Sequence, residues 1–533
     1  MSATTETCGV DEKFSEDGMA DKKREIEAMD LGEIKLREII RDEFQGHMKE
    51  MREDMSELFD NRIVNMATDI LQKMETVVSS NSKDLSEAAK YCNRIKPSEE
   101  DGLPRKQFLP RNSMLTDLYE IKHIRTMYNV IVTVLIILFI HTAIYDIRTT
   151  GSPNIAISTI KKGFAKLPVV LFVWTLMTCS TFGVYAAFCF WATRREQQPP
   201  KSFSRKVWDY GWLTALIAYE IIFIILPTKA VLKEELPVAS SMIVLMELTR
   251  MLMKKYAFVR SVAPRFLTYK SHSDMETIKP PDFSKFLYFL FAPTLVYQES
   301  YPRAKTIRWN IVLVNLAEVM AVIFCVALLY ERLVEPNFKD FGTQPVEWGM
   351  LILNILSAML PGTMMFVCGF YCLLHSWMNA FAELLRFGDK MFYKDWWNSR
   401  TYFMYYRTWN IVVHDWLYSY IYKDMYEIVT RRNKMLSMIT VFSISAIFHE
   451  YILSFTFRFF YPVMLTLFAG VGMFFLFVLK TNGNIFFWLT LFVGNGLMAS
   501  LYCMEHYARV NCPPVRDDFL DYLIPRSWTC ILQ

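Results

Sequence analysis

The sequence predicts an all-α polytopic membrane protein with about nine transmembrane helices and a cytosolic N-terminal helix. Three observations support this fold class. Hydrophobic residues make up 53% and aromatic residues 15% of the 533 residues, whereas charged residues make up only 21%, below the roughly 25% usual in soluble domains. Polar residues are concentrated in 1–125, and long apolar runs follow. The net charge of +4 is too small for this length to indicate nucleic-acid binding.

The N-terminal region, residues 1–120, is predicted to be cytosolic, because it is polar and lacks the apolar segment of a signal peptide. From 40 to 77, apolar side chains recur at steps of three and four, which is typical of one continuous helical stripe. Such a stripe must be buried, so we expect an oligomerisation helix; a helix lying on the membrane surface is the alternative. Residues 96–111, with three prolines and several charges, are expected to be a linker.

Residues 121–533 are predicted to form a membrane-embedded domain. A bilayer core requires about 20 apolar residues per helix. Basic residues concentrate in the loops 257–308 and 377–434, which places these loops and the N-terminus in the cytosol and the tail, 504–533, in the lumen. The predicted spans are 126–146, 167–192, 207–232, 238–256, 309–330, 350–376, 435–457, 461–480 and 484–503.

The weakest of these spans is 238–256. Four charged residues crowd it, namely Glu247, Arg250, Lys254 and Lys255. Charges are costly in lipid, so this helix is alternatively half-buried in protein or lies along the interface.

His449 is the residue most strongly indicated as functional. It lies well inside the apolar span 435–457, where an ionisable side chain costs about 3 kcal/mol and normally faces a cavity or a partner. A buried histidine tends to stay neutral, which is the form a general base requires. The alternative is a histidine hydrogen-bonded to a neighbouring helix. Glu450 points about 100° away on a helix and is expected to pair elsewhere, whereas Ser445 shares the histidine face.

A second group consists of Arg407, Asn410 and His414. If this stretch is helical, these side chains lie on one face. A cation, an amide and an imidazole in line suit a phosphorylated, carbonyl-bearing ligand. The alternative is an interfacial helix, since Trp409 and Trp416 are typical of the membrane surface.

A third group is the string Phe392-Tyr-Lys-Asp-Trp-Trp-Asn398, in a loop rich in aromatic and basic residues. Its physical properties alone indicate an aromatic anchor at the membrane surface. Nothing in its spacing requires catalysis.

Cys512 and Cys530 lie together in the polar tail that the predicted topology places in the oxidising lumen. A disulfide closing this 17-residue loop is expected. The sequence contains no CxxC pair, HExxH or other metal-ligand spacing, and no P-loop or GxSxG motif. We therefore expect no metal and no permanently bound cofactor.

The string 392–398, followed about fifty residues later by the pair His449-Glu450, resembles the sterol and diacylglycerol branch of the membrane-bound O-acyltransferases. The chain is most similar to the sterol O-acyltransferases (acyl-CoA:cholesterol acyltransferases), and the resemblance covers roughly 120–533. Asp415 stands where diacylglycerol acyltransferases more often have a lysine. The other segments that carry the resemblance are Tyr288–Tyr297, Ser300–Pro302, Arg407–Trp416 and Pro525–Cys530.

The resemblance implies the membrane-bound O-acyltransferase fold and transfer of a long-chain fatty-acyl group from acyl-CoA, the co-substrate, to the 3-hydroxyl of cholesterol. It implies that His449 is the catalytic histidine and that Asn410 assists at the thioester. An endoplasmic-reticulum membrane location, a dimer of dimers joined through the N-terminal helices, and a luminal Cys512–Cys530 disulfide are also implied. The residues implied to contact acyl-CoA are Tyr405, Arg407, Trp409, His414, Tyr422, Lys434 and Ser445. The signature residues, implicated in activity and acyl-CoA handling, are Phe392, Tyr393, Asp395, Trp396, Trp397 and Asn398.

Two other functions stay open. The first keeps the enzyme but changes the acceptor to diacylglycerol or another alcohol, since acceptor choice depends on cavity shape. The second is a polytopic lipid transporter or sterol-binding scaffold in which His449 is a relay or structural residue. The second function predicts internal repeats, and the sequence shows none.

Overall fold

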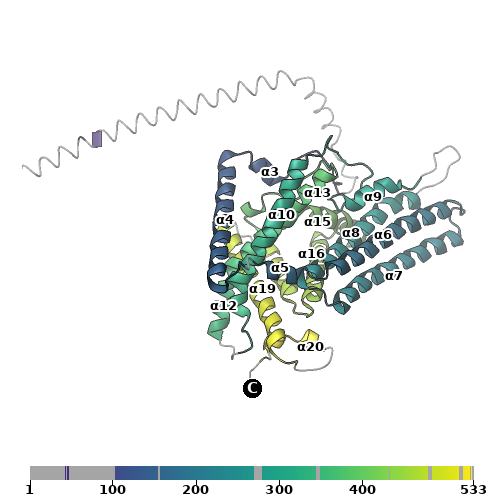
Figure 1. Ribbon diagram of the computed structural model, residues 1–533. Helices are drawn as coiled ribbons and strands as arrows, with labels where there is room; N and C mark the ends of the chain where they lie inside the picture. Colours follow the sequence, from purple (N-terminus) through teal and green to yellow (C-terminus); the bar gives the residue numbers. More distant parts are fainter. Residues whose placement is uncertain are drawn as a thin grey trace, which may run out of the picture. The chain divides into compact units, whose positions relative to one another are not determined.

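The computed structural model describes residues 43, 45, 46, 103–153, 156–268, 279–343, 348–430, 432–477, 483–514, 520–528 and 530 (Figure 1). The chain divides into two compact units, 1–102 and 103–533, and the description below concerns the second unit. The predicted oligomerisation helix at 40–77 lies outside the described residues, apart from three helical positions.

The described part of the second unit consists of helices joined by loops and contains no β-strand, in agreement with the predicted fold class. Several helices contain short wider π-helical segments, labelled η together with the two 3₁₀ turns, η3 and η7. The elements are α3 (Met114–Leu118), α4 (Lys122–Thr150), α5 (Ile157–Gly163), α6 (Leu167–Glu196), α7 (Phe203–Lys233), α8 (Val238–Thr268), α9 (Phe283–Phe291), α10 (Trp309–Leu329), η1 (Tyr330–Val334), α11 (Glu335–Phe338), α12 (Trp348–Phe370), η2 (Tyr371–Trp377), α13 (Met378–Leu384), η3 (Trp396–Asn398), α14 (Tyr402–Thr408), α15 (Ile411–Trp416), η4 (Leu417–Tyr422), η5 (Met425–Val429), α16 (Lys434–Phe457), α17 (Val463–Leu465), η6 (Thr466–Gly472), α18 (Met473–Phe477), α19 (Asn484–Asn511), α20 (Leu520–Leu523) and η7 (Arg526–Trp528).

Seven helices among the described residues are long and apolar enough to cross a membrane, by length and composition. Each overlaps one of the predicted spans, so the chain is a multi-pass membrane protein. Their apolar side chains are largely exposed, as expected for surfaces that face lipid rather than protein. These helices are Lys122–Thr150, Ile157–Glu196, Phe203–Lys233, Trp309–Phe338, Trp348–Leu384, Lys434–Phe457 and Asn484–Asn511.

The other two predicted spans, 238–256 and 461–480, are helical in the described residues but differ from these seven. The second contains a shorter apolar helix, Val463–Phe477. The first lies in α8, where Lys254 and Lys255 are only 2% and 1% exposed. Lys254 donates to backbone carbonyls at the end of α9, and Lys255 forms a 2.8 Å ion pair with Glu220. Because both ammonium groups are buried and have partners inside the protein, α8 fits the half-buried alternative. The total of nine spans stays a prediction.

Helix α16 lies between two groups of helices (Figure 1). On one side α6, α7 and α8 pack against one another, and on the other α12 packs along α19 and against α10. α16 itself contacts α7, α8, η4, η5, α17 and η6. α16 therefore has protein on several of its sides, even though it is apolar enough to face lipid.

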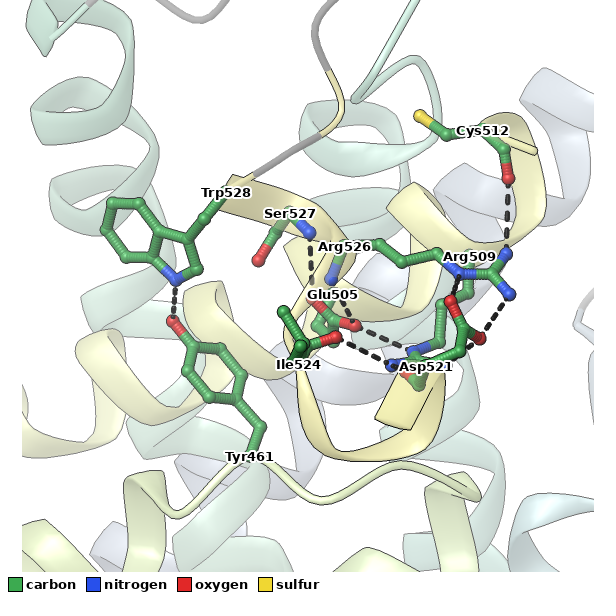
Figure 2. Close-up of polar contacts among 9 residues, drawn as sticks. All are labelled: Tyr461, Glu505, Arg509, Cys512, Asp521, Ile524, Arg526, Ser527 and Trp528. Atoms are coloured by element: carbon green, nitrogen blue, oxygen red, sulfur yellow. Dashed lines mark hydrogen bonds and ion pairs between the residues drawn. The ribbon is translucent and has the colours of Figure 1, made fainter. Parts of the chain in front are cut away.

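The end of α19 is tied to the C-terminal tail by a buried carboxylate, that of Glu505 (Figure 2). Glu505 is 0% exposed, and it accepts a 2.7 Å bond from Nε of Arg509 and the backbone N–H groups of Arg526 and Ser527 at 3.0 and 2.9 Å. The Arg526 guanidinium in turn binds Asp521 at 2.9 and 2.5 Å, and these bonds hold the pKa of the Asp521 carboxyl below its usual range. Ion pairs and hydrogen bonds to charged groups thus hold the tail against the end of α19.

Two further contacts fasten this tail. Cys512 and Cys530, the pair expected to form a disulfide, are joined by one, with their Cα atoms 6.1 Å apart. The indole Nε1 of Trp528 donates a 2.8 Å hydrogen bond to the hydroxyl of Tyr461, which precedes α17 (Figure 2). The tail therefore connects the ends of α19 and of the loop that follows α16.

Candidate active site

The imidazole of His449 is oriented by its own helix, α16. Its Nδ1 lies 2.7 Å from the backbone carbonyl oxygen of Ser445, one turn earlier. A carbonyl oxygen only accepts, so Nδ1 carries the hydrogen of this bond. In the neutral ring the lone pair is then on Nε2, which bonds to no described residue, and the side chain is exposed. His449 thus presents a free acceptor nitrogen inside an apolar helix. Ser445 shares its face, as predicted.

The neighbouring carboxylate, Glu450, faces away from this imidazole. It is 3% exposed and accepts the backbone N–H of Leu465 at 2.9 Å, the hydroxyl of Ser454 at 3.2 Å and that of Tyr502 at 3.4 Å. The prediction that Glu450 pairs elsewhere is confirmed. Its partners lie in α16, α17 and α19, so its role is to hold these helices together.

One aromatic ring connects His449 to the segment around Asn410. Phe468, in η6, stacks on the His449 imidazole with ring centroids 5.5 Å apart. The same ring contacts Tyr406 of α14 at 5.3 Å, and Tyr406 also contacts Phe442 of α16 at 4.9 Å. The structure therefore brings α14, which ends just before Asn410, to the face of α16 that carries the histidine.

The stretch from Arg407 to His414 is not a single helix, so the prediction that these side chains share one helical face is wrong. α14 ends at Thr408 and α15 begins at Ile411, with Asn410 extended between them at φ −139° and ψ 92°. The side-chain Oδ1 of Asn410 accepts the backbone N–H of Val413 at 3.1 Å. Asn410 is the N-cap of a new helix, a position that asparagine favours because its oxygen satisfies an unpaired amide.

This capping arrangement leaves part of the Asn410 amide unused. With Oδ1 engaged, the Nδ2 group makes no hydrogen bond to any described residue. An amide nitrogen only donates. Asn410 therefore combines a fixed backbone position with a free donor.

The signature string 392–398 supports this helix break from the other side. The backbone N–H of Ile411 donates to the carbonyl of Phe392 at 2.8 Å, and that of Lys394 donates to the carbonyl of Thr408 at 2.8 Å. The two bonds satisfy backbone groups on either side of Asn410 that the interrupted helix leaves unpaired. We call these two backbone hydrogen bonds the splint, because they hold the two short helices in place across the break.

The aromatic residues of the signature string are core residues, so the expectation of an aromatic anchor at the membrane surface is wrong. Phe392, Tyr393 and Trp396 are 1%, 0% and 2% exposed. Neighbouring rings from other helices supply enough contacts to bury them. Trp397 is half-buried, and its carbonyl accepts from Asn484 and Trp488 of α19, at 2.9 and 3.2 Å. Asp395 and Asn398 form the outer side of the loop and bond to each other at 3.4 Å.

Two of the residues expected to contact acyl-CoA belong to the same aromatic core. Tyr405 is 8% exposed and packs against Trp396 and Phe487. Trp409 stacks on Phe366 with centroids 4.4 Å apart and planes 9° apart. These side chains support the helix break, and in this conformation little of Tyr405 is open to a ligand.

The other expected contacts are more accessible. Arg407 is exposed, with its guanidinium over the ring of Phe403, and Lys434 is exposed at the first turn of α16. His414 and Tyr422 belong to a row of near-parallel rings at four-residue spacing. The row is His414, Tyr418, Tyr422 and Tyr426, with successive centroids 6.4, 5.7 and 5.9 Å apart.

A second histidine inside a membrane span, His375, was missed by the sequence analysis. It is 4% exposed, and its Nδ1 lies 2.6 Å from the hydroxyl of Tyr393 and 3.2 Å from Nδ2 of Asn379. Because the Asn379 amide nitrogen only donates, Nδ1 is the acceptor, the opposite tautomer from His449. The argument from the cost of an ionisable group in lipid, used for His449, would have found it. Through its bond to Tyr393, His375 holds the signature loop against η2.

Within the part of the chain that the structure describes, no three His, Cys, Asp or Glu side chains are grouped so as to hold a metal ion. The polar groups left available among the described residues are an imidazole acceptor on His449, an amide donor on Asn410 and the exposed cations Arg407 and Lys434. An acceptor, a donor and cations are the groups that suit a carbonyl-bearing anion.

The fold and the site together define a multi-pass helical membrane protein with an accessible histidine inside its membrane domain, the arrangement expected of an enzyme that acts on lipids. The pattern of the membrane-bound O-acyltransferase family matches residues 171–504. The chain therefore belongs to the membrane-bound O-acyltransferase family and is an acyltransferase.

Similar proteins align over most of the chain. Sterol O-acyltransferase 1 of Chlorocebus aethiops is 37% identical over 527 residues, which cover 97% of this chain and 95% of that protein. Sterol O-acyltransferase 1 of Cricetulus griseus is 41% identical over 432 residues, or 80% of this chain and 78% of that protein. Sterol O-acyltransferase 2 of Mus musculus is 40% identical over 435 residues, or 80% and 81%.

Proposed function

We propose that this chain is an acyl-CoA:sterol O-acyltransferase that transfers a long-chain fatty-acyl group to the 3-hydroxyl of cholesterol, forming cholesteryl ester and CoA. Its similarity to two sterol O-acyltransferases over about four fifths of the chain or more supports this acceptor. The observation that carries the chemistry is the geometry of His449, whose Nδ1–H is bound to Ser445 while Nε2 is free.

In the proposed reaction, His449 is the general base. A sterol hydroxyl is a poor nucleophile, while a thioester is already activated. Nε2 takes the hydroxyl proton as the oxygen attacks the thioester carbon, a contribution typically of about 10²–10⁴ in rate. The new C–O bond forms, the C–S bond breaks, and the departing CoA sulfur receives the proton from the imidazolium. The bond from Nδ1–H to Ser445 holds the ring in the required tautomer throughout.

Asn410 is proposed to stabilise the thioester oxygen. Negative charge develops on this oxygen as the hydroxyl attacks, and a fixed donor placed there lowers the barrier. Nδ2 of Asn410 is the donor left free by helix capping. The splint formed by Phe392 and Lys394 keeps this donor in place, which supports a role for the signature loop in positioning rather than in chemistry.

Acyl-CoA is proposed to bind along the exposed side of α14, α15 and η4. Arg407 and Lys434 are exposed cations able to pair with phosphates, and His414 and Tyr422 are proposed to contact acyl-CoA from the row of stacked rings. Ser445 and Trp409 belong to the same proposed acyl-CoA site, and the buried Tyr405 is proposed to support it through its packing. The reaction calls for no metal ion and no bound cofactor, since the acyl donor is itself activated.

The wider setting is part of the same proposal. The enzyme is placed in the endoplasmic-reticulum membrane, with its N-terminus in the cytosol, where acyl-CoA is available, and its disulfide-bonded tail in the lumen. It is proposed to assemble as a dimer of dimers through its N-terminal helices. Removal of residues 1–80 should reduce particle mass while retaining activity; an unchanged mass would argue against this assembly.

The acceptor is tested by offering the purified full-length protein labelled oleoyl-CoA with cholesterol or with diacylglycerol. Cholesteryl oleate is the expected product. Preferential formation of triacylglycerol would show that the acceptor is diacylglycerol and not a sterol. The proposed acyl transfer itself would still hold.

The base is tested by His449→Ala, which should abolish transfer while oleoyl-CoA still binds. A matched control is His141→Ala, because His141 also lies within a membrane span but belongs to α4 and bonds to no described residue. His141→Ala should retain full activity. Unaltered turnover by His449→Ala would refute the mechanism.

A further inference from the structure

A short extended segment at the start of the second unit, residues 103–111, lies across the candidate acyl-CoA site. We call it the strap. Its backbone at Leu103 donates to the carboxylate of Glu427 at 3.0 Å, and the carbonyl of Lys106 accepts from the side-chain amide of Gln298 at 3.1 Å. At its far end, Arg111 pairs with Asp389 in a bidentate arrangement, at 2.6 and 3.2 Å. These anchors belong to three different parts of the membrane domain.

The middle of the strap forms one ion pair that reaches the proposed acyl-CoA site. Nζ of Lys106 lies 2.6 Å from Oδ2 of Asp415, and both side chains are mostly covered, 17% and 20% exposed. The strap and α15 meet at a small cavity lined by both residues and by Phe392 of the signature loop. The Lys106–Asp415 pair therefore joins the strap to α15, next to Phe392 of the signature loop.

Asp415 is a carboxylate that lies beside the proposed site for an anionic substrate. It directly follows His414, and its Oδ1 lies 3.4 Å from Nδ1 of that histidine. Burial raises the pKa of Asp415, but the hydrogen bond with His414 and the positive charge of Lys106 outweigh it and hold the pKa below its usual range. Asp415 is consequently negative at neutral pH, beside a surface on which we place the phosphates of CoA.

We propose that Lys106 is a positioning residue for acyl-CoA, because it neutralises Asp415 and so keeps this carboxylate from repelling the anionic substrate. This inference rests on the proposed function, since it takes acyl-CoA to bind beside His414. A charge left unpaired at about 20% exposure acts through a medium of lower dielectric than water, so its repulsion is felt over several ångströms.

Charge compensation can be separated from simple attachment of the strap. If Lys106 merely fastened the strap, removal of Asp415 would be as harmful as removal of Lys106, and the two losses would not offset each other. If Lys106 acts by neutralising Asp415, then removing the carboxylate should repair the loss of the lysine. The double variant itself separates the two: it stays as impaired as Lys106→Met if the pair only fastens the strap, and returns to near wild type if Lys106 acts by neutralising Asp415.

The experiment compares Lys106→Met, Asp415→Asn and the double variant, using purified full-length protein, oleoyl-CoA and cholesterol. Lys106→Met should raise KM for oleoyl-CoA about tenfold, while KM for cholesterol and kcat stay near wild type, and about 0.5 M salt should shrink the defect by screening. Asp415→Asn in the Lys106→Met background should return KM for oleoyl-CoA to within about twofold of wild type.

A suitable control is Lys285→Met, because Lys285 also pairs with a carboxylate, that of Glu299 at 3.4 Å, but at a more exposed position, with side chains 40% and 36% exposed. It should leave every kinetic constant unchanged. A double variant no better than Lys106→Met alone, or an unchanged KM in Lys106→Met, would overturn the inference. Absence of oleoyl transfer by the wild-type protein would instead overturn the proposed function, so the two failures are distinguishable.

Discussion

The backbone N–H of Ile411 donates a 2.8 Å hydrogen bond to the carbonyl oxygen of Phe392. With the matching bond from Lys394 to Thr408, it closes the gap between two short helices and leaves Asn410 extended at their junction. Backbone groups at helix ends must find partners, and here the signature loop supplies them. The loop that identifies the family in sequence is thus a support for one amide side chain.

Asn410 is predicted to have two separable roles, as a helix cap and as a hydrogen-bond donor. Asn410→Ser keeps a capping oxygen but loses Nδ2, so thermal stability should stay near wild type while kcat falls by about 10²–10³. Asn410→Ala loses both, and should also lower stability by about 1 kcal/mol. Thermal unfolding in detergent and acyl-transfer kinetics measure the two effects. A fully active Asn410→Ser variant would show that Nδ2 of Asn410 has no role as a hydrogen-bond donor in the reaction.

Phe468 is predicted to hold the imidazole of His449, the proposed base, in place. Its ring stacks on His449 at 5.5 Å, so Phe468→Ala should let the imidazole rotate away from its productive position and lower kcat about tenfold, with KM for both substrates little changed. Phe474→Ala is the control, because Phe474 is 50% exposed and its only ring contact among the described residues is with the neighbouring Phe475. Equal kcat values in the two variants would contradict this prediction.

The hydroxyl of Tyr393 is predicted to stabilise the fold through His375. Tyr393→Phe removes a 2.6 Å hydrogen bond in a buried site, which should cost about 1 kcal/mol, because Asn379 still donates to the same nitrogen. The midpoint of thermal unfolding in detergent should fall. The exposed Tyr210 provides the comparison: Tyr210→Phe should unfold at the wild-type temperature, and an equal midpoint for Tyr393→Phe would show that the bond contributes nothing.

The C-terminal tail is predicted to lose stability in acid. Because Arg526 lowers the pKa of Asp521 in the folded protein, this carboxylate contributes stability above the unfolded pKa of about 3.9, and the contribution disappears as pH falls through the lower folded value. Asp521→Asn should lower stability at pH 7 by about 1–2 kcal/mol and flatten the acid decline. Unfolding curves between about pH 7 and pH 3 measure both. A decline as steep as that of wild type would assign the acid sensitivity to another group.

The amount of structure predictable from sequence differs between the membrane helices and the site. Seven of the predicted spans coincide with long apolar helices, because the cost of exposing backbone groups to lipid forces any apolar run of sufficient length into a helix. α8 is the exception. Its charged residues made it the weakest predicted span, and the structure shows that Lys254 and Lys255 have partners inside the protein. Such partners come from distant residues and leave no local trace in the sequence.

The site shows the same division. His449 stood out because one ionisable residue in an apolar helix is a local anomaly, and the same test would have marked His375. The helix break at Asn410 did not stand out, because the bonds that stabilise it come from Phe392 and Lys394, outside the segment itself. The burial of Trp396 was mispredicted for a similar reason: an aromatic ring suits a membrane surface and a packed core equally well.

By itself, therefore, the sequence determined that this chain is a multi-pass helical membrane protein, which residue in it is the candidate base, and which family its signature string resembles. Those properties depend on composition and on spacing within single helices. Only the tertiary structure decided the backbone bonds from Ile411 to Phe392 and from Lys394 to Thr408, which stabilise the helix break at Asn410, and the pairing of Lys106 with Asp415. Each of these is a hydrogen bond or charge pair whose geometry is set by the folded backbone, and two polar groups become partners only when packing brings them within about 3 Å of each other.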